Sequence, residues 1–198
     1  HHILVGANAP THTDELARWP EETWNKITAL WGHPYQSDAP HPSAGRTHDG
    51  TGYCLRIYHD AHPDDYKRLI SLYPRLTIIV RYHWPAGSLP PGSVLTCRRG
   101  EPYLADLWTL KERLDWLNEH GVQWVLELGN EPNVELPNWA PDRVLQWWQE
   151  QLDIVAHDYP GKTVLLPSLS PNETERSWWS VWRQQAEAWG QAATHAYW

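Results

Sequence analysis

The chain has 198 residues, a net charge of −8 and a pI near 5.8. This length is enough for one substantial hydrophobic core, but it is shorter than the roughly 250 residues typical of an eight-unit barrel. The acidic balance excludes the basic face of nucleic-acid binders, and no apolar run reaches the roughly 20 residues of a membrane span. The N-terminus lacks the charged and apolar regions of a signal peptide. Because the chain contains no Met, we expect that a segment upstream of His1 was removed, and a secreted origin stays open.

Cysteine and tryptophan usage adds two expectations. Cys54 and Cys97 allow one disulfide, but Cys54 lies in a strand-like apolar run, which favours a buried free thiol. The chain has 15 Trp and no Phe. Flat tryptophan rings stack on the C–H faces of sugars and also fill protein cores, so this composition favours a sugar-binding protein without excluding a purely structural use.

Apolar runs alternate with segments of helical period, which is typical of repeated strand-helix units and a parallel sheet. The first two strands are expected at Ile3–Gly6 and Tyr53–His59. The helices that follow them carry apolar stripes, with Trp24, Ile27 and Trp31 in the first and Tyr66, Leu69, Ile70 and Tyr73 in the second.

The third strand is expected at Leu76–Trp84, followed by a long loop from Pro85 to Pro102. Its helix carries Leu107, Leu110, Leu114 and Leu117 and ends at His120-Gly121. The fourth strand begins at Trp124, and its helix starts near Pro141, ends at Tyr159-Pro160-Gly161 and is striped by Leu145, Trp148, Leu152 and Val155.

The fifth strand is expected at Thr163–Leu169, before a helix that carries Trp178, Val181, Trp182 and Trp189. Ser170 to Glu173 resembles the capping box of that helix. A sixth strand starts within Thr194–Trp198.

This order predicts a single α/β domain over residues 1–198, a TIM-type (β/α) barrel that is incomplete at its C-terminal end. An open parallel sheet would leave two edges free to pair with a second copy, so a homo-oligomer is one expectation. The alternative is a doubly wound sheet. Against it, Val5–Pro10 replaces the Gly-rich phosphate turn that such a sheet places after its first strand.

The most informative segment is Trp124–Asn133, an apolar run that ends in Gly129-Asn130-Glu131-Pro132. Strand alternation places Glu127, Gly129 and Glu131 on one face. If that face points into a barrel, Glu131 lies at the mouth and Glu127 about 13 Å deeper, at about 3.3 Å per residue. The two carboxyls are then too far apart to act together, and a buried Glu127 requires an Arg or His partner.

This segment resembles the acid/base strand of the clan A glycoside hydrolases, barrel enzymes whose fourth strand ends in Asn-Glu, often Asn-Glu-Pro. The resemblance implies that Glu131 is the general acid and base of a retaining mechanism and that Asn130 hydrogen-bonds the sugar 2-hydroxyl. The clan's nucleophile ends a seventh strand, which we expect beyond this chain. Asp60 and Glu135 are the nearest substitutes by position, but neither matches the family pattern, so no nucleophile is assigned. A simple strand-ending turn is the structural alternative for Asn-Glu-Pro.

The same resemblance implies further substrate-binding residues. Arg56 is similar to the clan's strand-two Arg, which orients active-site carboxylates, and a structural pairing with Glu127 is the alternative. His83 follows Arg81 on the same face and matches a substrate-binding His of some members, or is a hydrogen-bonded core residue. His195 and Tyr197 match a His-x-Tyr that begins strand six in several families.

No cofactor is expected, since the chain shows no phosphate loop, no G-x-S-x-G elbow and no paired CxxC. A metal site at His59, Asp60 and His62 is not expected either, because this cluster opens a helix whose first turn favours acidic residues. The leading hypothesis is a retaining glycoside hydrolase with a carbohydrate substrate. The alternatives are a non-catalytic carbohydrate-binding or structural relic of such a barrel, completed by oligomerisation, and a doubly wound hydrolase. The walls of a substrate cleft are expected in the Pro85–Pro102 loop and near Trp139.

Overall fold

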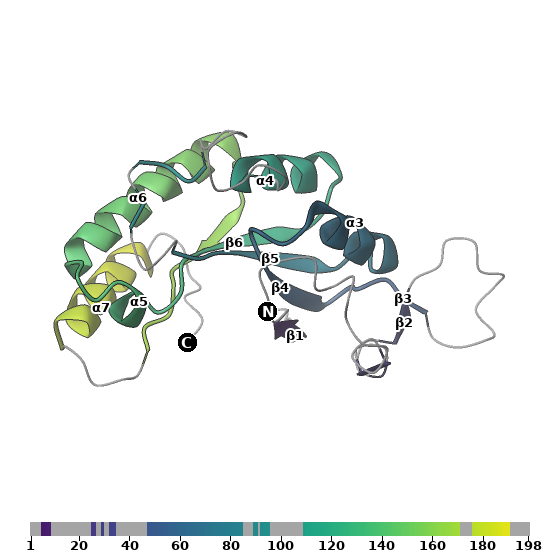
Figure 1. Ribbon diagram of the computed structural model, residues 1–198, viewed down its shortest axis with the longest axis horizontal. Helices are drawn as coiled ribbons and strands as arrows, with labels where there is room; N and C mark the ends of the chain where they lie inside the picture. Colours follow the sequence, from purple (N-terminus) through teal and green to yellow (C-terminus); the bar gives the residue numbers. More distant parts are fainter. Residues whose placement is uncertain are drawn as a thin grey trace. The chain divides into compact units, whose positions relative to one another are not determined.

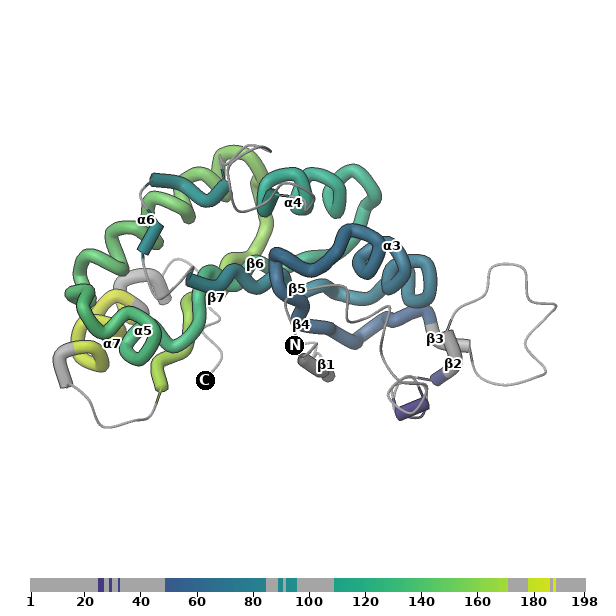
Figure 2. The backbone as a smooth tube through the Cα atoms, viewed as in Figure 1, coloured from purple at the N-terminus to yellow at the C-terminus, as the bar shows by residue number. Residues whose placement is uncertain are grey.

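A computed structural model describes residues 5–8, 25–26, 29, 32–34, 47–84, 89–90, 92–95, 109–170 and 176–190 (Figures 1 and 2). Its contacts divide the chain into two compact units. Unit 1 comprises His1–Val80 and Cys97–Val125, and unit 2 comprises Arg81–Thr96 and Leu126–Trp198.

Five strands form the main sheet in the described part of the chain. These are β1 (Val5–Asn8), β4 (Tyr53–Tyr58), β5 (Thr77–Tyr82), β6 (Trp124–Leu128) and β7 (Thr163–Leu165), hydrogen-bonded in that order. A separate parallel pair, β2 (His33–Pro34) with β3 (Thr47–His48), was not predicted.

Neighbouring strands of the main sheet run parallel. In β1 and β4, Val5 is opposite Tyr53 and Asn8 is opposite Arg56. Beside β5, the Ile78 N–H donates to the Gln123 carbonyl at 2.9 Å and the Gly129 N–H to the Tyr82 carbonyl at 2.9 Å, so both segments advance together. The order of the described strands never reverses, whereas a doubly wound sheet reverses at a switch point. The predicted α/β class with a parallel sheet is confirmed, and closure into a barrel stays a prediction.

Unit 1 contains the helices α3 (Pro63–Leu72) and α4 (Leu110–Glu119), and local sequence explains where each begins. The His62 side chain accepts the Asp64 N–H at the N-cap of α3, Pro63 takes the first position, and Asp64 and Asp65 occupy the first turn. The His59–His62 cluster therefore opens a helix, as predicted. Thr109 and Glu112 form a capping box at the start of α4.

A buried arginine joins these two helices to the end of β4. Arg113 of α4 is fully buried and donates to the carbonyls of Tyr58 at 3.1 Å and Ala61 at 2.5 Å. Its guanidinium lies 4.3 Å from the centre of the Tyr66 ring of α3, and the Tyr66 hydroxyl donates to the same Tyr58 carbonyl. Burial raises the pKa of Tyr66 to about 12, although the Arg113 charge opposes this rise. Both helices therefore contact the same strand end.

Unit 2 contains α5 (Pro132–Glu135), α6 (Pro141–Asp158) and α7 (Arg176–Gly190). On α6, the buried Gln151 side chain accepts hydrogen bonds from the Ser93 hydroxyl at 3.0 Å and the Val94 N–H at 3.1 Å. The Trp147 indole donates to the Gly92 carbonyl at 3.0 Å. These bonds fasten residues 92–95, a described piece of the long loop, to α6. On α7, the Trp182 indole donates to the Pro167 carbonyl at 3.0 Å.

Most predicted elements are found near their expected bounds. The exceptions are α5, which was missed, and β7, which is shorter than Thr163–Leu169. The stripe of the first helix, the capping box at Ser170–Glu173 and the sixth strand at Thr194–Trp198 lie wholly or partly outside the described residues.

Cys54 is a buried free thiol, as expected, and burial raises its pKa against the opposing charge of Arg56, while Cys97 is not among the described residues. None of the helices in the described ranges is long and apolar enough to cross a bilayer.

We predict that Arg113→Met lowers the free energy of unfolding by about 2–4 kcal/mol, because the Ala61 carbonyl stays buried without its donor and the stacking on Tyr66 is lost. Urea denaturation measures this change. Lys111→Met on the same helix removes a partly exposed ion pair with Asp115 and is expected to cost less than about 0.5 kcal/mol. Equal losses in the two variants would show that Arg113 does not hold this end of β4.

Candidate active site

The tip of β6 is fixed by two hydrogen bonds from its neighbourhood. The Gly129 N–H continues the ladder to the Tyr82 carbonyl, and the Trp84 indole N–H donates to the Asn130 carbonyl at 3.0 Å. Gly129 has φ +99°, and a Cβ there would overlap the indole of Trp84. Glycine is required for both reasons, its conformation and the close approach of the indole.

Three aromatic side chains pack behind this tip. The ring centres of Trp84 and Trp147 lie 5.0 Å apart in an edge-on arrangement, and those of Tyr82 and Trp84 lie 6.1 Å apart. Trp84 and Trp147 are both buried. Because the indole of Trp84 is held by β5 on one side and α6 on the other, its N–H is a fixed donor to the Asn130 carbonyl.

Glu131 begins the one-turn helix α5 in a left-handed conformation, with φ 30° and ψ 59°. Among the described residues it is the only non-glycine with positive φ. Its carbonyl accepts the N–H groups of Val134 at 2.8 Å and Glu135 at 2.9 Å. A left-handed residue with a Cβ costs about 1–2 kcal/mol, and such strain gathers at functional sites. The strand-ending turn, which was the structural alternative for Asn-Glu-Pro, is therefore present, and its backbone is strained at Glu131.

The Glu131 carboxylate is not used for capping. The helix start has no side-chain capping bond, and the Glu131 side chain has no hydrogen bond or ion pair within the described part of the chain. It is partly exposed. Since its backbone is fixed and no described residue engages the carboxyl, Glu131 is a candidate to contact a ligand.

Asn130 and Glu135 form the shortest contact at this site. The Asn130 amide Nδ2 donates to Glu135 Oε1 at 2.6 Å. Burial raises the pKa of Glu135, and the charge of Glu131 adds to the rise. The Asn130 hydrogen bond and the charges of Arg81 and His83 oppose it. Arg81, His83 and Glu131 therefore all lie within electrostatic reach of Glu135.

Glu127 has the buried cationic partner that the sequence required. Arg81 Nε donates to Glu127 Oε2 at 2.9 Å, and Arg81 Nη2 donates to Oε1 at 2.9 Å. The two side chains are only 10% and 5% exposed. A bidentate pair of this kind fixes the two strands side by side and neutralises both charges beneath the tip of β6.

A second buried clamp holds α5. The Asn133 amide donates to the Ser170 carbonyl at 3.0 Å, and the Ser170 N–H donates back to Asn133 Oδ1 at 2.9 Å. Both residues are buried. This reciprocal pair ties the turn that carries Glu131 to the segment that follows β7, and sequence reasoning did not find it.

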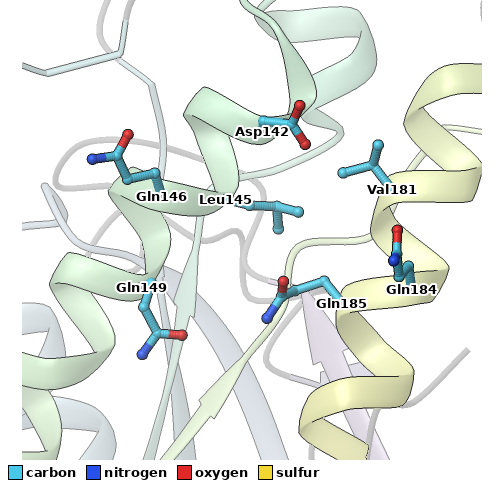
Figure 3. A pocket seen from close by; sticks show the side chains of 7 residues that line it. All are labelled: Asp142, Leu145, Gln146, Gln149, Val181, Gln184 and Gln185. Atoms are coloured by element: carbon cyan, nitrogen blue, oxygen red, sulfur yellow. The ribbon is translucent and has the colours of Figure 1, made fainter.

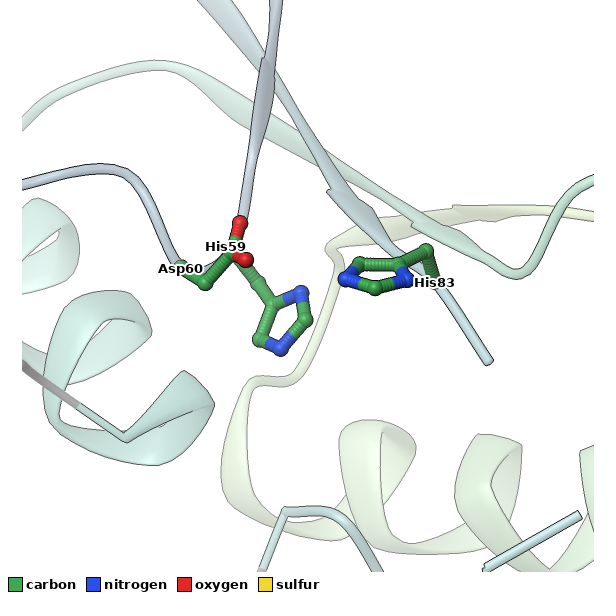
Figure 4. Close-up of side chains that lie close together, drawn as sticks. All are labelled: His59, Asp60 and His83. Carbon is green, nitrogen blue, oxygen red and sulfur yellow. The ribbon is translucent and has the colours of Figure 1, made fainter. Parts of the chain in front are cut away.

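The other residues that the sequence brought into question are placed as follows. His83 follows β5 directly, and His59 and Asp60 follow β4; Figure 4 shows these three side chains. Arg56 lies in β4, opposite Asn8 of β1. His195 and Tyr197 lie outside the described residues. The structure thus places Asn130 and Glu131 in contact with Glu135, which the sequence suggested only as a substitute nucleophile, and His83 lies within electrostatic reach of Glu135.

A polar groove of about 420 Å³ lies between α6 and α7 (Figure 3). Its lining contains Asp142, Leu145, Gln146, Gln149, Val181, Gln184 and Gln185. None of these residues belongs to the cleft walls predicted at Pro85–Pro102 and Trp139.

Comparisons with protein-family models, with curated proteins and with solved structures gave no match to this chain. The chemistry of the site therefore has to be inferred from its own geometry. That geometry offers a carboxyl at Glu131 that has no partner among the described residues, an amide at Asn130 fixed by a hydrogen bond, and a half-buried carboxyl at Glu135.

We predict that Gly129→Ala lowers the free energy of unfolding by about 3 kcal/mol or more, because backbone strain adds to displacement of the Trp84 indole. Gly161→Ala is the matched control, since Gly161 also has positive φ, +79°, but a Cβ there meets nothing within 4 Å. Its expected cost is about 1 kcal/mol. Urea unfolding and near-ultraviolet circular dichroism measure both. Equal losses of unfolding free energy in the two variants would contradict the inference that the Trp84 indole requires a glycine at position 129.

We predict that carboxyl NMR places the pKa of Glu135 above that of an ordinary glutamate. Asn130→Ala raises it further because the hydrogen bond to the carboxylate is lost, and Glu131→Gln lowers it because the neighbouring negative charge is removed. Titration of the three proteins against pH measures the changes. Shifts of opposite sign would contradict the described contacts.

The same pKa direction has a consequence for stability. Because the folded pKa of Glu135 lies above the unfolded value, its contribution to stability is fully present below the unfolded pKa and is lost as the pH rises through the folded pKa. Glu135→Gln removes this dependence. We therefore expect the stability of Glu135→Gln, relative to the unsubstituted protein, to increase with pH across that interval, as measured by urea unfolding at several pH values.

Proposed function

We propose that this chain carries the acid/base half of a retaining glycoside hydrolase that cleaves O-glycosidic bonds of an oligosaccharide or polysaccharide. The observation that carries the proposal is Glu131, a strained left-handed residue at the carboxyl end of a parallel strand, whose carboxyl has no partner in the described part of the chain. Carboxyl ends of parallel strands are where α/β barrels present their catalytic groups. The unreversed order of the described strands supports the barrel that this proposal requires.

Glu131 acts twice in the proposed reaction. In the first step its carboxyl proton passes to the glycosidic oxygen as the C–O bond breaks and a carboxylate nucleophile bonds to the anomeric carbon. In the second step the Glu131 carboxylate removes a proton from water, which attacks the same carbon and releases the nucleophile. The nucleophile is proposed to come from a further strand, as in clan A, and no described residue is assigned to it.

Asn130 is proposed to bind the sugar 2-hydroxyl. One Nδ2 hydrogen is held by Glu135, and no other described residue engages Oδ1 or the second N–H, so both are proposed to serve a ligand. Hydrogen bonds at the 2-hydroxyl strengthen in the transition state of this reaction. His83, which lies in the electrostatic surroundings of Glu135, is proposed as a further substrate contact, and Arg56, His195 and Tyr197 keep the substrate-binding roles that the resemblance implies.

We predict that Glu131→Gln lowers kcat on an aryl β-glycoside by about 10²–10⁴, because the group that exchanges the proton is removed while its shape is kept. A panel of 4-nitrophenyl β-glycosides with the full native polypeptide measures turnover. Glu150→Gln, an exposed carboxyl of α6, is the matched control and is expected to leave kcat unchanged.

Two outcomes would contradict the proposal. Unchanged turnover in Glu131→Gln would show that Glu131 is not the acid/base. Sugar binding without hydrolysis of any glycoside in the panel would favour the alternative, a non-catalytic carbohydrate-binding protein derived from such a barrel.

A further inference from the structure

We propose that Glu135 is a positioning residue that fixes which way the Asn130 amide faces, so that Oδ1 of Asn130 is presented as an acceptor to the proton of the sugar 2-hydroxyl. This inference rests on the proposed function of Glu131 and Asn130. It assigns to Glu135 a role other than that of nucleophile.

The contacts connect Glu135 to both proposed functional residues. Its carboxylate accepts the Asn130 amide hydrogen at 2.6 Å, and its backbone N–H donates to the Glu131 carbonyl at 2.9 Å. Glu135 is half-buried, on the single turn of α5. The Asn133–Ser170 clamp in the same turn holds its backbone in place.

The chemistry of the pair selects one amide orientation. An ionised carboxylate only accepts hydrogen bonds, so it binds the Nδ2 side of Asn130 and rejects the Oδ1 side. Oδ1 is then left for a donor, and within the described part of the chain no group donates to it. A hydroxyl of a substrate supplies such a donor. A neutral glutamine at position 135 both donates and accepts, so it would allow either orientation.

The orientation of the Asn130 amide is selected only while Glu135 is ionised, so the charges around Glu135 determine the pH range of this effect. Arg81 of β5 and His83 just after that strand favour the ionised form, as does the Asn130 amide, while Glu131 and burial oppose it. Protonated Glu135 becomes a donor and no longer excludes the reversed amide. The preference for a substrate with a 2-hydroxyl over its 2-deoxy counterpart is therefore expected to weaken as the pH falls and Glu135 becomes protonated.

The first test compares two substrates in the full native polypeptide: the best 4-nitrophenyl β-glycoside of a panel and its 2-deoxy counterpart. For Glu135→Gln we expect kcat/KM to fall by about tenfold on the 2-hydroxy substrate, about the value of one hydrogen bond, and by less than about twofold on the 2-deoxy substrate. Glu150→Gln is the control and is expected to change neither. An equal fall on both substrates would mean a merely structural role and would overturn the proposal.

The second test exchanges the two partners. Asn130→Asp places two carboxyls in the 2.6 Å contact, whereas Asn130→Asp with Glu135→Gln restores a donor and an acceptor in reversed polarity. We expect the double variant to unfold at a higher urea concentration than Asn130→Asp. It should stay impaired on the 2-hydroxy substrate, because the amide introduced at position 135 now donates to the carboxylate introduced at position 130. Activity equal to that of the unsubstituted protein would overturn the proposed orientation.

An NMR measurement separates failure of this inference from failure of the proposed function. The Asn130 side-chain amide is expected to show one proton protected from exchange, and to lose that protection in Glu135→Ala. If the protein hydrolyses no glycoside while this signal behaves as expected, the proposed function fails and the pair survives only as a structural contact. If hydrolysis is observed and the signal is insensitive to Glu135→Ala, the positioning role alone is overturned.

Discussion

The close approach of the Trp84 indole to Gly129 is the constraint on which the rest of the site depends. Because position 129 has no Cβ, the indole can lie against the backbone and donate to the Asn130 carbonyl. The chain direction at the end of β6 is then fixed, and the following residue takes the strained left-handed conformation at Glu131. Packing of Trp84 on Trp147 stabilises this arrangement from the α6 side.

Beneath this tip the charges are arranged to cancel. The Arg81–Glu127 pair buries one positive and one negative group with two hydrogen bonds, and the charge of Arg81 still acts on Glu135 above it. A buried pair is weak evidence for stability, but it is sensitive to geometry and so opposes a slip of one strand past the other. At Glu135 the charges of Arg81 and His83 favour the ionised carboxylate, whereas burial and the charge of Glu131 oppose it.

Sequence patterns predicted the position of Glu131, because an apolar run that stops at Gly-Asn-Glu-Pro can only end at a turn, and they predicted that Glu127 needs a cationic partner. They did not predict the Trp84 contact or the Asn133–Ser170 clamp, since these join residues 46 and 37 positions apart through strand register. The roles of Gln151 and Trp147 were not predicted either, because the buried face of α6 is wider than its apolar stripe. Residues 92–95 of the long loop pack on the part of that face that contains Gln151 and Trp147. The acid/base role proposed for Glu131 comes from the family resemblance, and the strained backbone there supports a functional site in general.

The central claim is that Glu131 is the acid/base, and the product formed by azide tests it most directly. The variant Glu131→Gly of the full native polypeptide is incubated with an aryl β-glycoside that has a good leaving group, with and without sodium azide, and the anomeric configuration of the glycosyl azide is determined by NMR. The account predicts faster turnover with azide and a β-glycosyl azide, because azide attacks the covalent intermediate from the face that Glu131 normally serves. An α-glycosyl azide would make Glu131 the nucleophile, and no effect of azide would contradict its role in a retaining mechanism.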